Sequence, residues 1–302
     1  MSEKNIEIER KKQEIIESLD WSGKSLKESS NEMWEDNDFV DQVIFKTGQY
    51  ALKYAPEETV SNVEVLKKAV CRDGRSLKFA SENIKGNKEI VLLAVKNDPR
   101  VLVYAAEELK SDIDIAKACR GYIEYVDDSL KDDYSFIFYS VSKSQWAFKY
   151  SSIRLKDDKE IASLAVSQLG LSLEWVSERL RNDRELVFKA VMNDGCAIKY
   201  ACEELKNDHS IAMAAVKSNP RAIALISTDF SKDRKFVLEA VRERPQVLEY
   251  LDECFKNDKE IVIEAVRNNQ NVRKYASISL KKDEDFKIML RKAVKEAARK
   301  GG

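Results

Sequence analysis

A 25-residue period runs through most of this chain and constrains its fold more than any other feature. Two well-formed repeats read NKEIVLLAVKNDPRVLVYAAEELKS at residues 87–111 and DRELVFKAVMNDGCAIKYACEELKN at residues 183–207. The repeat at residues 112–132 is shorter, with only 21 residues. The repeats begin at Asn37, Asn62, Asn87, Asp112, Asp133, Asp158, Asp183, Asp208, Asp233, Asp258 and Asp283. A fixed period of this length is typical of solenoids, in which one supersecondary unit recurs along the chain.

Each repeat is predicted to form two short antiparallel helices. The Asp or Asn at its start can accept hydrogen bonds from free backbone N–H groups and so cap the first helix. A Glu two residues later, as at Glu89 and Glu185, favours the positive end of the helix dipole. Apolar residues then recur at helical spacing, as in Ile90, Val91, Ala94 and Val95.

The two predicted helices are separated by Asp or Asn followed by Gly or Pro, as at Asp98-Pro99 and Asp194-Gly195, because these pairs favour turns. The second helix is expected to carry Leu102, Tyr104, Ala105 and Leu109 and to continue into the cap of the next repeat. The residue at the eighth position is usually Ala, which should permit close approach between helices. These alanines are Ala69, Ala94, Ala165, Ala190, Ala215, Ala240 and Ala265.

Neighbouring repeats must stack, because one pair of ten-residue helices cannot bury its own apolar face. The predicted fold is therefore an all-α solenoid of short antiparallel helix pairs. Residues 1–36 are expected to form an irregular N-terminal cap, and residues 37–282 the solenoid. Residues 283–302 are expected to form a C-terminal capping helix and tail, whose last residues, Gly301 and Gly302, are interpreted as a frayed end.

The recurring pattern NDxE-I-V-x-x-A-V-x-N, followed by G-x-A-L-x-Y-A-x-E-E-L-K-N-D, resembles a known helical repeat. It is similar to the family catalogued as domain of unknown function 4116, whose domain would hold two of these 25-residue repeats. The likeness extends over residues 37–283 and is plainest at 87–111 and 158–282. It implies a helical repeat and no catalytic residue, and the repeat at 112–132 departs from it.

The charge balance argues against a general nucleic-acid binder. Lys and Arg total 52 and Asp and Glu total 53, whereas phosphate neutralisation requires a basic surplus. The charged N-terminus predicts no secretory signal, and no apolar run is long enough for a membrane-spanning helix. The cysteines are scattered without a Cys-x-x-Cys pair, which favours a reduced, cytoplasmic protein.

The sequence offers little catalytic chemistry. His209 is the only histidine, and aligned repeats carry Lys88, Arg184 and Lys259 at its position, so an exposed residue in the first turn of a helix is the favoured interpretation. Neither a Gly-rich phosphate loop nor a Gly-x-Ser-x-Gly motif occurs. Carboxylate pairs such as Glu107-Glu108 are interpreted as a solvated helix face beside Lys110. We expect no catalytic residue, no cofactor and no metal site.

An aromatic residue recurs near the end of almost every repeat. These residues are Tyr54, Phe79, Tyr104, Tyr125, Tyr150, Trp175, Tyr200, Tyr250 and Tyr275. They could stack on successive bases of a single-stranded nucleic acid, with neighbouring lysines such as Lys199 contacting phosphates. A core role is favoured, because each ring lies within one turn of apolar Leu and Ala positions and because the lysine position is broken at Val103 and Glu124.

The irregular centre is the only candidate binding site. Residues 122–150 are rich in aromatics, and some of these, such as Phe136 and Phe148, occupy core positions of the repeat. Trp146 and Tyr134 instead stand where other repeats carry Arg or Lys, and Tyr122 is a weaker third candidate. Exposed aromatic residues are enriched at interface hot spots. The alternative is that these rings fill the gap left by the missing four residues.

The function predicted from these features is a non-catalytic protein–protein interaction scaffold, with a protein partner of unspecified identity and no membrane insertion. A single-stranded nucleic-acid-binding repeat protein is the second candidate. A structural subunit of a larger assembly is the third.

Overall fold

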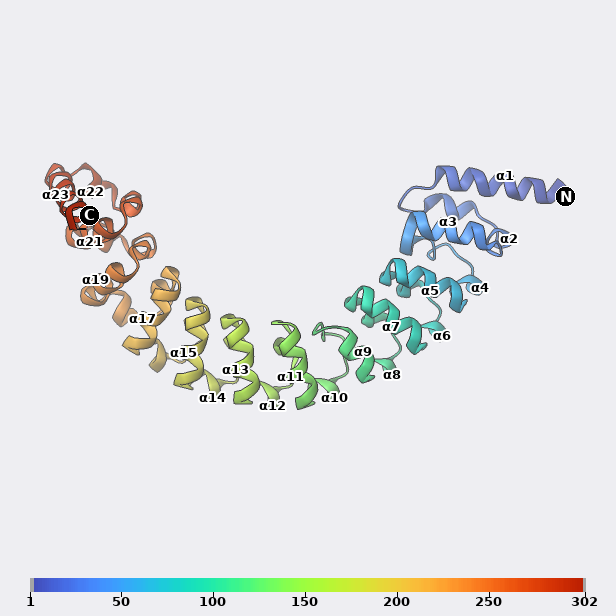
Figure 1. Ribbon diagram of the computed structural model, residues 1–302, viewed down its shortest axis with the longest axis horizontal. Coiled ribbons are helices and arrows are strands. Elements are labelled where there is room, and N and C mark those ends of the chain that lie inside the picture. Colours follow the sequence, from blue (N-terminus) through green and yellow to red (C-terminus); the bar gives the residue numbers. More distant parts are fainter. Residues whose placement is uncertain (1–2, 301–302) are drawn as a thin grey trace. The chain divides into compact units, whose positions relative to one another are not determined.

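In the computed structural model, residues 3–300 are described, and they form helices and turns with no β-strand among them (Figure 1). The chain divides into two compact parts, residues 1–152 and 153–302. Within each part the repeats are stacked, and the long helices of consecutive repeats pack side by side except after the shortened repeat at residues 112–132. The all-α solenoid predicted from the repeat is confirmed.

Every repeat begins with a long helix. In the N-terminal part these helices are α3 (Asn37–Thr47), α5 (Val63–Arg72), α7 (Lys88–Asn97), α9 (Ile113–Ala118) and α11 (Tyr134–Lys143). In the C-terminal part they are α13 (Lys159–Gln168), α15 (Arg184–Asn193), α17 (His209–Ser218), α19 (Arg234–Glu243), α21 (Lys259–Asn268) and α23 (Glu284–Lys300).

The predicted caps form at nearly every expected residue. From α5 to α21, the Asp or Asn that begins each repeat accepts a hydrogen bond from a backbone N–H two or three residues later. Asn37 is the exception, because Asp36 caps α3 instead by accepting from the N–H of Asp38. The first repeat of the solenoid therefore begins one residue earlier than predicted.

The second half of each repeat is not one helix, so the two-helix prediction is wrong in this respect. It is a 3-10 helix followed by a separate short α-helix, except in the shortened repeat, where turns replace the 3-10 helix. The 3-10 helices are η2 (Gly48–Tyr50), η3 (Gly74–Phe79), η4 (Pro99–Tyr104), η5 (Ala147–Tyr150), η6 (Gly170–Glu174), η7 (Gly195–Tyr200), η8 (Pro220–Ala224), η9 (Pro245–Tyr250) and η10 (Gln270–Tyr275). The short helices are α4 (Glu57–Val60), α6 (Glu82–Lys85), α8 (Glu107–Lys110), α10 (Asp128–Lys131), α12 (Ile153–Lys156), α14 (Glu178–Arg181), α16 (Glu203–Lys206), α18 (Thr228–Ser231), α20 (Glu253–Lys256) and α22 (Ile278–Lys282).

The break between these two segments is stabilised by the preceding repeat. At Ala105 the backbone is extended (φ −70°, ψ 155°). The N–H of the next residue, Ala106, then donates to the carbonyl of Lys85 over 3.0 Å. An uninterrupted helix would use this N–H internally, so the bond between repeats replaces a bond within one helix.

The same bond between repeats continues through the shortened repeat. Asp127 N–H donates to the Lys110 carbonyl over 3.0 Å, and Ser152 N–H donates to the Lys131 carbonyl over 2.9 Å. The missing residues are absorbed earlier in the repeat, where α9 has 6 residues in place of the 10 found in α7. The backbone bonds between repeats are therefore kept although the helix is shortened.

The core lies between the long helices and the 3-10 helices. The alanines at the eighth position are fully buried, as are Ile90, Val91 and Leu102. The small side chain at this position therefore belongs to the packed interior of the solenoid.

Helices also form the two ends of the described chain. Residues before the first repeat form α1 (Glu3–Ser18), η1 (Lys24–Glu28) and α2 (Asn31–Trp34), which is the same order of segments as in a repeat. The Lys12 ammonium joins α1 to the cap of α3 through a 2.6 Å contact with Asp36. At the other end, α23 buries Phe286, Leu290 and Ala293. Gly301 and Gly302 lie outside the described residues.

Candidate binding surface

Two consecutive turns in the N-terminal part carry the same Asp-x-Arg arrangement. Asp73 Oδ1 accepts from the backbone N–H of Arg75 over 3.0 Å and from its Nε over 2.9 Å, while Oδ2 accepts from Nη2 over 2.9 Å. Asp98 binds Arg100 in the same way, over 3.0, 2.9 and 2.8 Å. Each aspartate therefore fixes both the turn and the direction of the guanidinium that follows it.

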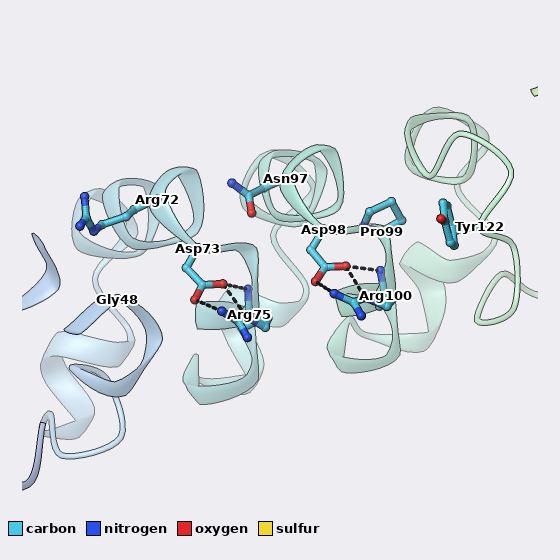
Figure 2. Close-up of a pocket in the computed structure, with 9 residues that line it drawn as sticks. All are labelled: Gly48, Arg72, Asp73, Arg75, Asn97, Asp98, Pro99, Arg100 and Tyr122. Atoms are coloured by element: carbon cyan, nitrogen blue, oxygen red, sulfur yellow. Dashed lines mark hydrogen bonds and ion pairs between the residues drawn. The ribbon is translucent and has the colours of Figure 1, made fainter. Parts of the chain in front are cut away.

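These bonds use one edge of each guanidinium, formed by Nε and Nη2. The end of the fork, formed by the two terminal nitrogens, keeps further N–H donors. The hydrogen bond from Arg100 lowers the pKa of the Asp98 carboxyl below its ordinary value, so that the pair stays ionised at neutral pH. Figure 2 shows the two Asp–Arg pairs side by side on neighbouring repeats, with Tyr122 beyond Pro99.

The two pairs line an open groove with a volume of about 810 Å³. Arg72 also lines this groove, and its guanidinium carbon lies 4.3 Å from the centre of the Phe45 ring. Three arginines and two aspartates line the groove, so it carries a small positive excess. Tyr122, whose side chain is largely solvent-exposed, supplies an aromatic surface next to these charges.

The shortened repeat presents Tyr122 at this position. After α9 the backbone turns through Arg120 (φ 51°) and Gly121 (φ 88°). Both lie in the left-handed region, which is unusual for Arg and favourable for Gly. A Cβ at Gly121 would lie 2.4 Å from Cβ of Ser144 and 2.9 Å from the carbonyl oxygen of Ser140. The turn therefore packs directly against the end of α11, where the next turn begins.

The predicted exposure of the three candidate aromatics is confirmed. The exposed fraction is 58% for Tyr122, 49% for Trp146 and 37% for Tyr134. Phe136 and Phe148 are buried, as their core positions require. Whether the three exposed rings bind a partner stays a prediction.

Only two of these three rings, those of Tyr122 and Trp146, lie on neighbouring turns. Trp146 occupies the turn position that Arg75 and Arg100 occupy in earlier repeats, and its turn adjoins the Gly121–Tyr122 turn. Tyr134 begins α11, at the end opposite Trp146, where it stacks on Phe138 with ring centres 6.0 Å apart. We call Arg75, Arg100, Tyr122 and Trp146 the turn row.

Arg75 and Arg100 were not proposed as binding residues from the sequence; they are two of the residues that stand at the position of Trp146 in other repeats. The available signal was the Asp-x-Arg spacing in two consecutive repeats, at residues 73–75 and 98–100.

We call the aromatic residues that recur near the ends of the repeats the aromatic ladder, and the prediction that they belong to the core is wrong. Tyr125 and Tyr250 are exposed, and the other aromatic members are only partly buried. Most of these rings lie where a 3-10 helix ends, beside the extended break, and therefore at the edge of the packed interior. A lysine lies over five of them, with its Nζ 4.4–5.6 Å from the ring centre. The pairs are Lys53–Tyr54, Lys78–Phe79, Lys149–Tyr150, Lys199–Tyr200 and Lys274–Tyr275.

His209 lies in the exposed first turn of α17, as expected. Its Nε2 is 3.1 Å from Oε2 of Glu239, and its ring meets Phe230 and Phe236 edge-on. It borders a separate groove of about 550 Å³ beside Phe188. No group of three or more His, Cys, Asp or Glu suited to a metal ion occurs among the residues that the structure describes.

The first glutamate of each of two carboxylate pairs forms a surface ion pair. The Glu107–Lys110 distance is 2.6 Å and the Glu203–Lys206 distance is 2.8 Å, each within one short helix. This agrees with the predicted solvated helix face.

Comparison with known protein families identifies the repeat. The model of the family described as domain of unknown function (DUF4116) matches residues 62–110, 87–119, 139–181, 158–206, 183–231 and 233–281. The chain belongs to this family. The DUF4116 matches stop at residue 119 and resume at 139, so the later part of the shortened repeat, with Tyr122, and the start of α11, with Tyr134, lie between them.

A search of curated proteins and a search of solved structures each found no significant match. Between residues 3 and 300, no helix is both long enough and apolar enough to span a membrane.

Proposed function

We propose that this DUF4116 chain is a non-catalytic scaffold that binds a protein partner through the turn row. The observation that carries the proposal is the placement of Arg75, Arg100, Tyr122 and Trp146 on four consecutive repeats. Arginine and large aromatic residues are the types enriched at interface hot spots, and here they are exposed on a stacked helical support. The proposal includes the absence of catalytic activity. It also includes a cytoplasmic location, which the exposed free thiols of Cys71 and Cys254 favour.

The partial exposure of the aromatic ladder favours a second candidate, a single-stranded nucleic-acid binder. Stacking on a base requires an accessible ring face. In the five lysine–ring pairs the ammonium lies over the ring, as for Lys199 at 4.4 Å from the Tyr200 centre. A stacking base would have to displace this cation, so the ladder supports the second candidate less well than the turn row supports protein binding.

The test is affinity capture with the tagged full-length chain, followed by mass spectrometry. Trp146→Ala is compared with Gln246→Ala, which changes an exposed residue at the same turn position in a distant repeat. We expect Trp146→Ala to weaken capture of the partner at least several-fold, while Gln246→Ala leaves it unchanged. Tyr134→Ala is expected to have a smaller effect, because Tyr134 lies at the other end of α11.

Thermal unfolding of each variant controls for folding, and Trp146→Ala should lose about 1 kcal/mol, since half of the ring is already exposed. A parallel capture after nuclease treatment separates the two candidates. Loss of all partners with nuclease would favour nucleic acid. Equal capture by the wild type and Trp146→Ala would reject the turn row.

A further inference from the structure

We infer that the groove between Arg75 and Arg100 binds an acidic peptide segment whose carboxylates lie three residues apart. The inference deepens the proposed function, because it names the chemistry of the polypeptide that the turn row would hold. It starts from the two guanidinium groups that Asp73 and Asp98 hold in the same orientation on neighbouring repeats.

The free edge of each guanidinium suits a carboxylate. Asp73 and Asp98 occupy the Nε–Nη2 edges, and the terminal nitrogens at the ends of the forks can donate two parallel hydrogen bonds to another carboxylate. Because each arginine is already oriented, binding would cost less side-chain entropy than it would at a flexible lysine. Arg75 and Arg100 are both more than half exposed, so a ligand can reach them.

The charge of the groove favours separate carboxylates over a polyphosphate. Arg72, Arg75 and Arg100 line the groove together with Asp73 and Asp98, which leaves one positive charge in excess. A continuous phosphate backbone would bring further negative charge close to both aspartates. A peptide can present a carboxylate at each arginine and uncharged atoms between them, so it avoids this repulsion.

The spacing of the repeats sets the spacing of the acidic residues. Arg75 and Arg100 are equivalent positions in stacked repeats, and packed helices lie about 9 Å apart. A peptide in the polyproline II conformation has three residues per turn and returns to the same face after roughly 9 Å. A Glu-x-x-Glu segment in this conformation therefore places one carboxylate at each arginine.

The next position along the segment reaches the Tyr122 turn. Tyr122 and Pro99 line the groove with apolar surface next to Arg100. A third side chain, three residues after the second Glu, would meet this surface, where an aromatic residue can pack on the Tyr122 ring. The inferred ligand is thus Glu-x-x-Glu-x-x-Phe or a close chemical equivalent.

The test is fluorescence anisotropy with the full-length chain and a labelled peptide, Gly-Glu-Pro-Ala-Glu-Pro-Ala-Phe-Gly. One control peptide carries Gln for both Glu residues, and another has the same composition with the two Glu residues adjacent. We expect both controls to bind at least tenfold more weakly. Arg75→Gln and Arg100→Gln should each weaken the Glu peptide about tenfold.

Arg221→Gln is the matched control variant, because Arg221 has the same turn position in a repeat that does not line this groove. It should bind the peptide like the wild type. Circular dichroism should show equal helix content for all three variants. A variant that loses helix is replaced by Tyr122→Ala, which should weaken the Phe peptide more than its Ala analogue.

Equal binding of the Glu and Gln peptides, or equal weakening by Arg221→Gln and Arg75→Gln, would overturn the inference. The inference would also be overturned if an oligothymidylate bound more tightly than the Glu peptide and this binding depended on Arg75. Partner binding through the turn row, which is the proposed function, fails by a different result, namely partner capture that does not depend on Trp146. The two failures can therefore be told apart.

Discussion

A Cβ atom added to Gly195 would lie 2.0 Å from the carbonyl oxygen of Ala215, in the next repeat. The same relationship joins Gly74 to Ala94, at 2.5 Å, and Gly170 to Ala190, at 2.4 Å. The turn after a long helix therefore packs directly on the backbone of its neighbour, and the eighth-position alanine leaves room for it.

This contact makes Gly195→Ala a strongly destabilising substitution. The added methyl group meets backbone that cannot move aside, so the free energy of unfolding should fall by about 3 kcal/mol. Urea denaturation followed by circular dichroism would measure the change.

Gly86→Ala is the control for Gly195→Ala. A Cβ at Gly86 has ordinary contacts, with the Asn83 carbonyl oxygen 3.5 Å away. Stability should stay the same or rise by about 0.5 kcal/mol, because Ala restricts the unfolded chain. A comparable loss in both variants would contradict the account of close backbone packing.

Asn193 connects two repeats through its side-chain amide. Its Oδ1 accepts from the Gly170 N–H over 2.6 Å, and its Nδ2 donates to the Ser167 carbonyl over 2.9 Å. Asn193→Ala should lower the free energy of unfolding by about 2 kcal/mol, since the buried Gly170 N–H loses its acceptor and the Ser167 carbonyl loses its donor.

Asn193→Ser should restore part of that stability. In the following repeat, Ser218 makes the equivalent pair of contacts, with the Gly195 N–H and the Met192 carbonyl. Equal unfolding midpoints for the Ala and Ser variants would show that these bonds contribute little.

The partial exposure of the aromatic ladder predicts unequal effects within one 3-10 helix. Phe148 is fully buried in η5, whereas Tyr150 lies partly exposed under the Lys149 ammonium. Phe148→Ala should cost about 4 kcal/mol, as for other large core truncations. Tyr150→Ala should cost about 1 kcal/mol. Equal losses of unfolding free energy in the two variants, measured by thermal or urea unfolding, would show that the aromatic ladder belongs to the core.

The Lys12–Asp36 pair predicts a pH-dependent cap between α1 and α3. The hydrogen bond from Lys12 lowers the pKa of the Asp36 carboxyl below its ordinary value. The stabilisation of the folded state by this ion pair is therefore complete above the ordinary Asp pKa of about 3.9. It is lost as the pH falls through the lower pKa that Asp36 has in the folded state.

Lys12→Gln should destabilise the protein by about 1 kcal/mol at pH 7, a modest value because Asp36 is about one-third exposed. The difference from the wild type should shrink below about pH 4. Lys27→Gln, which changes an exposed lysine of η1, is the control and should show no such trend. A gap that grows in acid would have the wrong sign for this pair.

Part of the candidate site was readable from the sequence. Tyr122 was a candidate because it lies in the repeat that is four residues short. Trp146 was a candidate because other repeats carry Arg at its position, which indicates an exposed turn. The groove was not predicted, because it depends on Arg75 and Arg100 lying next to each other in space and on the direction in which Asp73 and Asp98 hold them.

The sequence by itself determined the long helices, their caps and the stacking of repeats. These features follow from local chemistry, namely an Asp or Asn such as Asp158 before a helix and apolar residues at helical spacing. Tertiary structure decided the break at Ala105 and the exposure of rings such as Tyr250. At both positions the outcome depends on the neighbouring repeat, which supplies the Lys85 carbonyl at one break and sets how far the core extends. Residue type alone determines neither the position of that carbonyl nor the extent of the core.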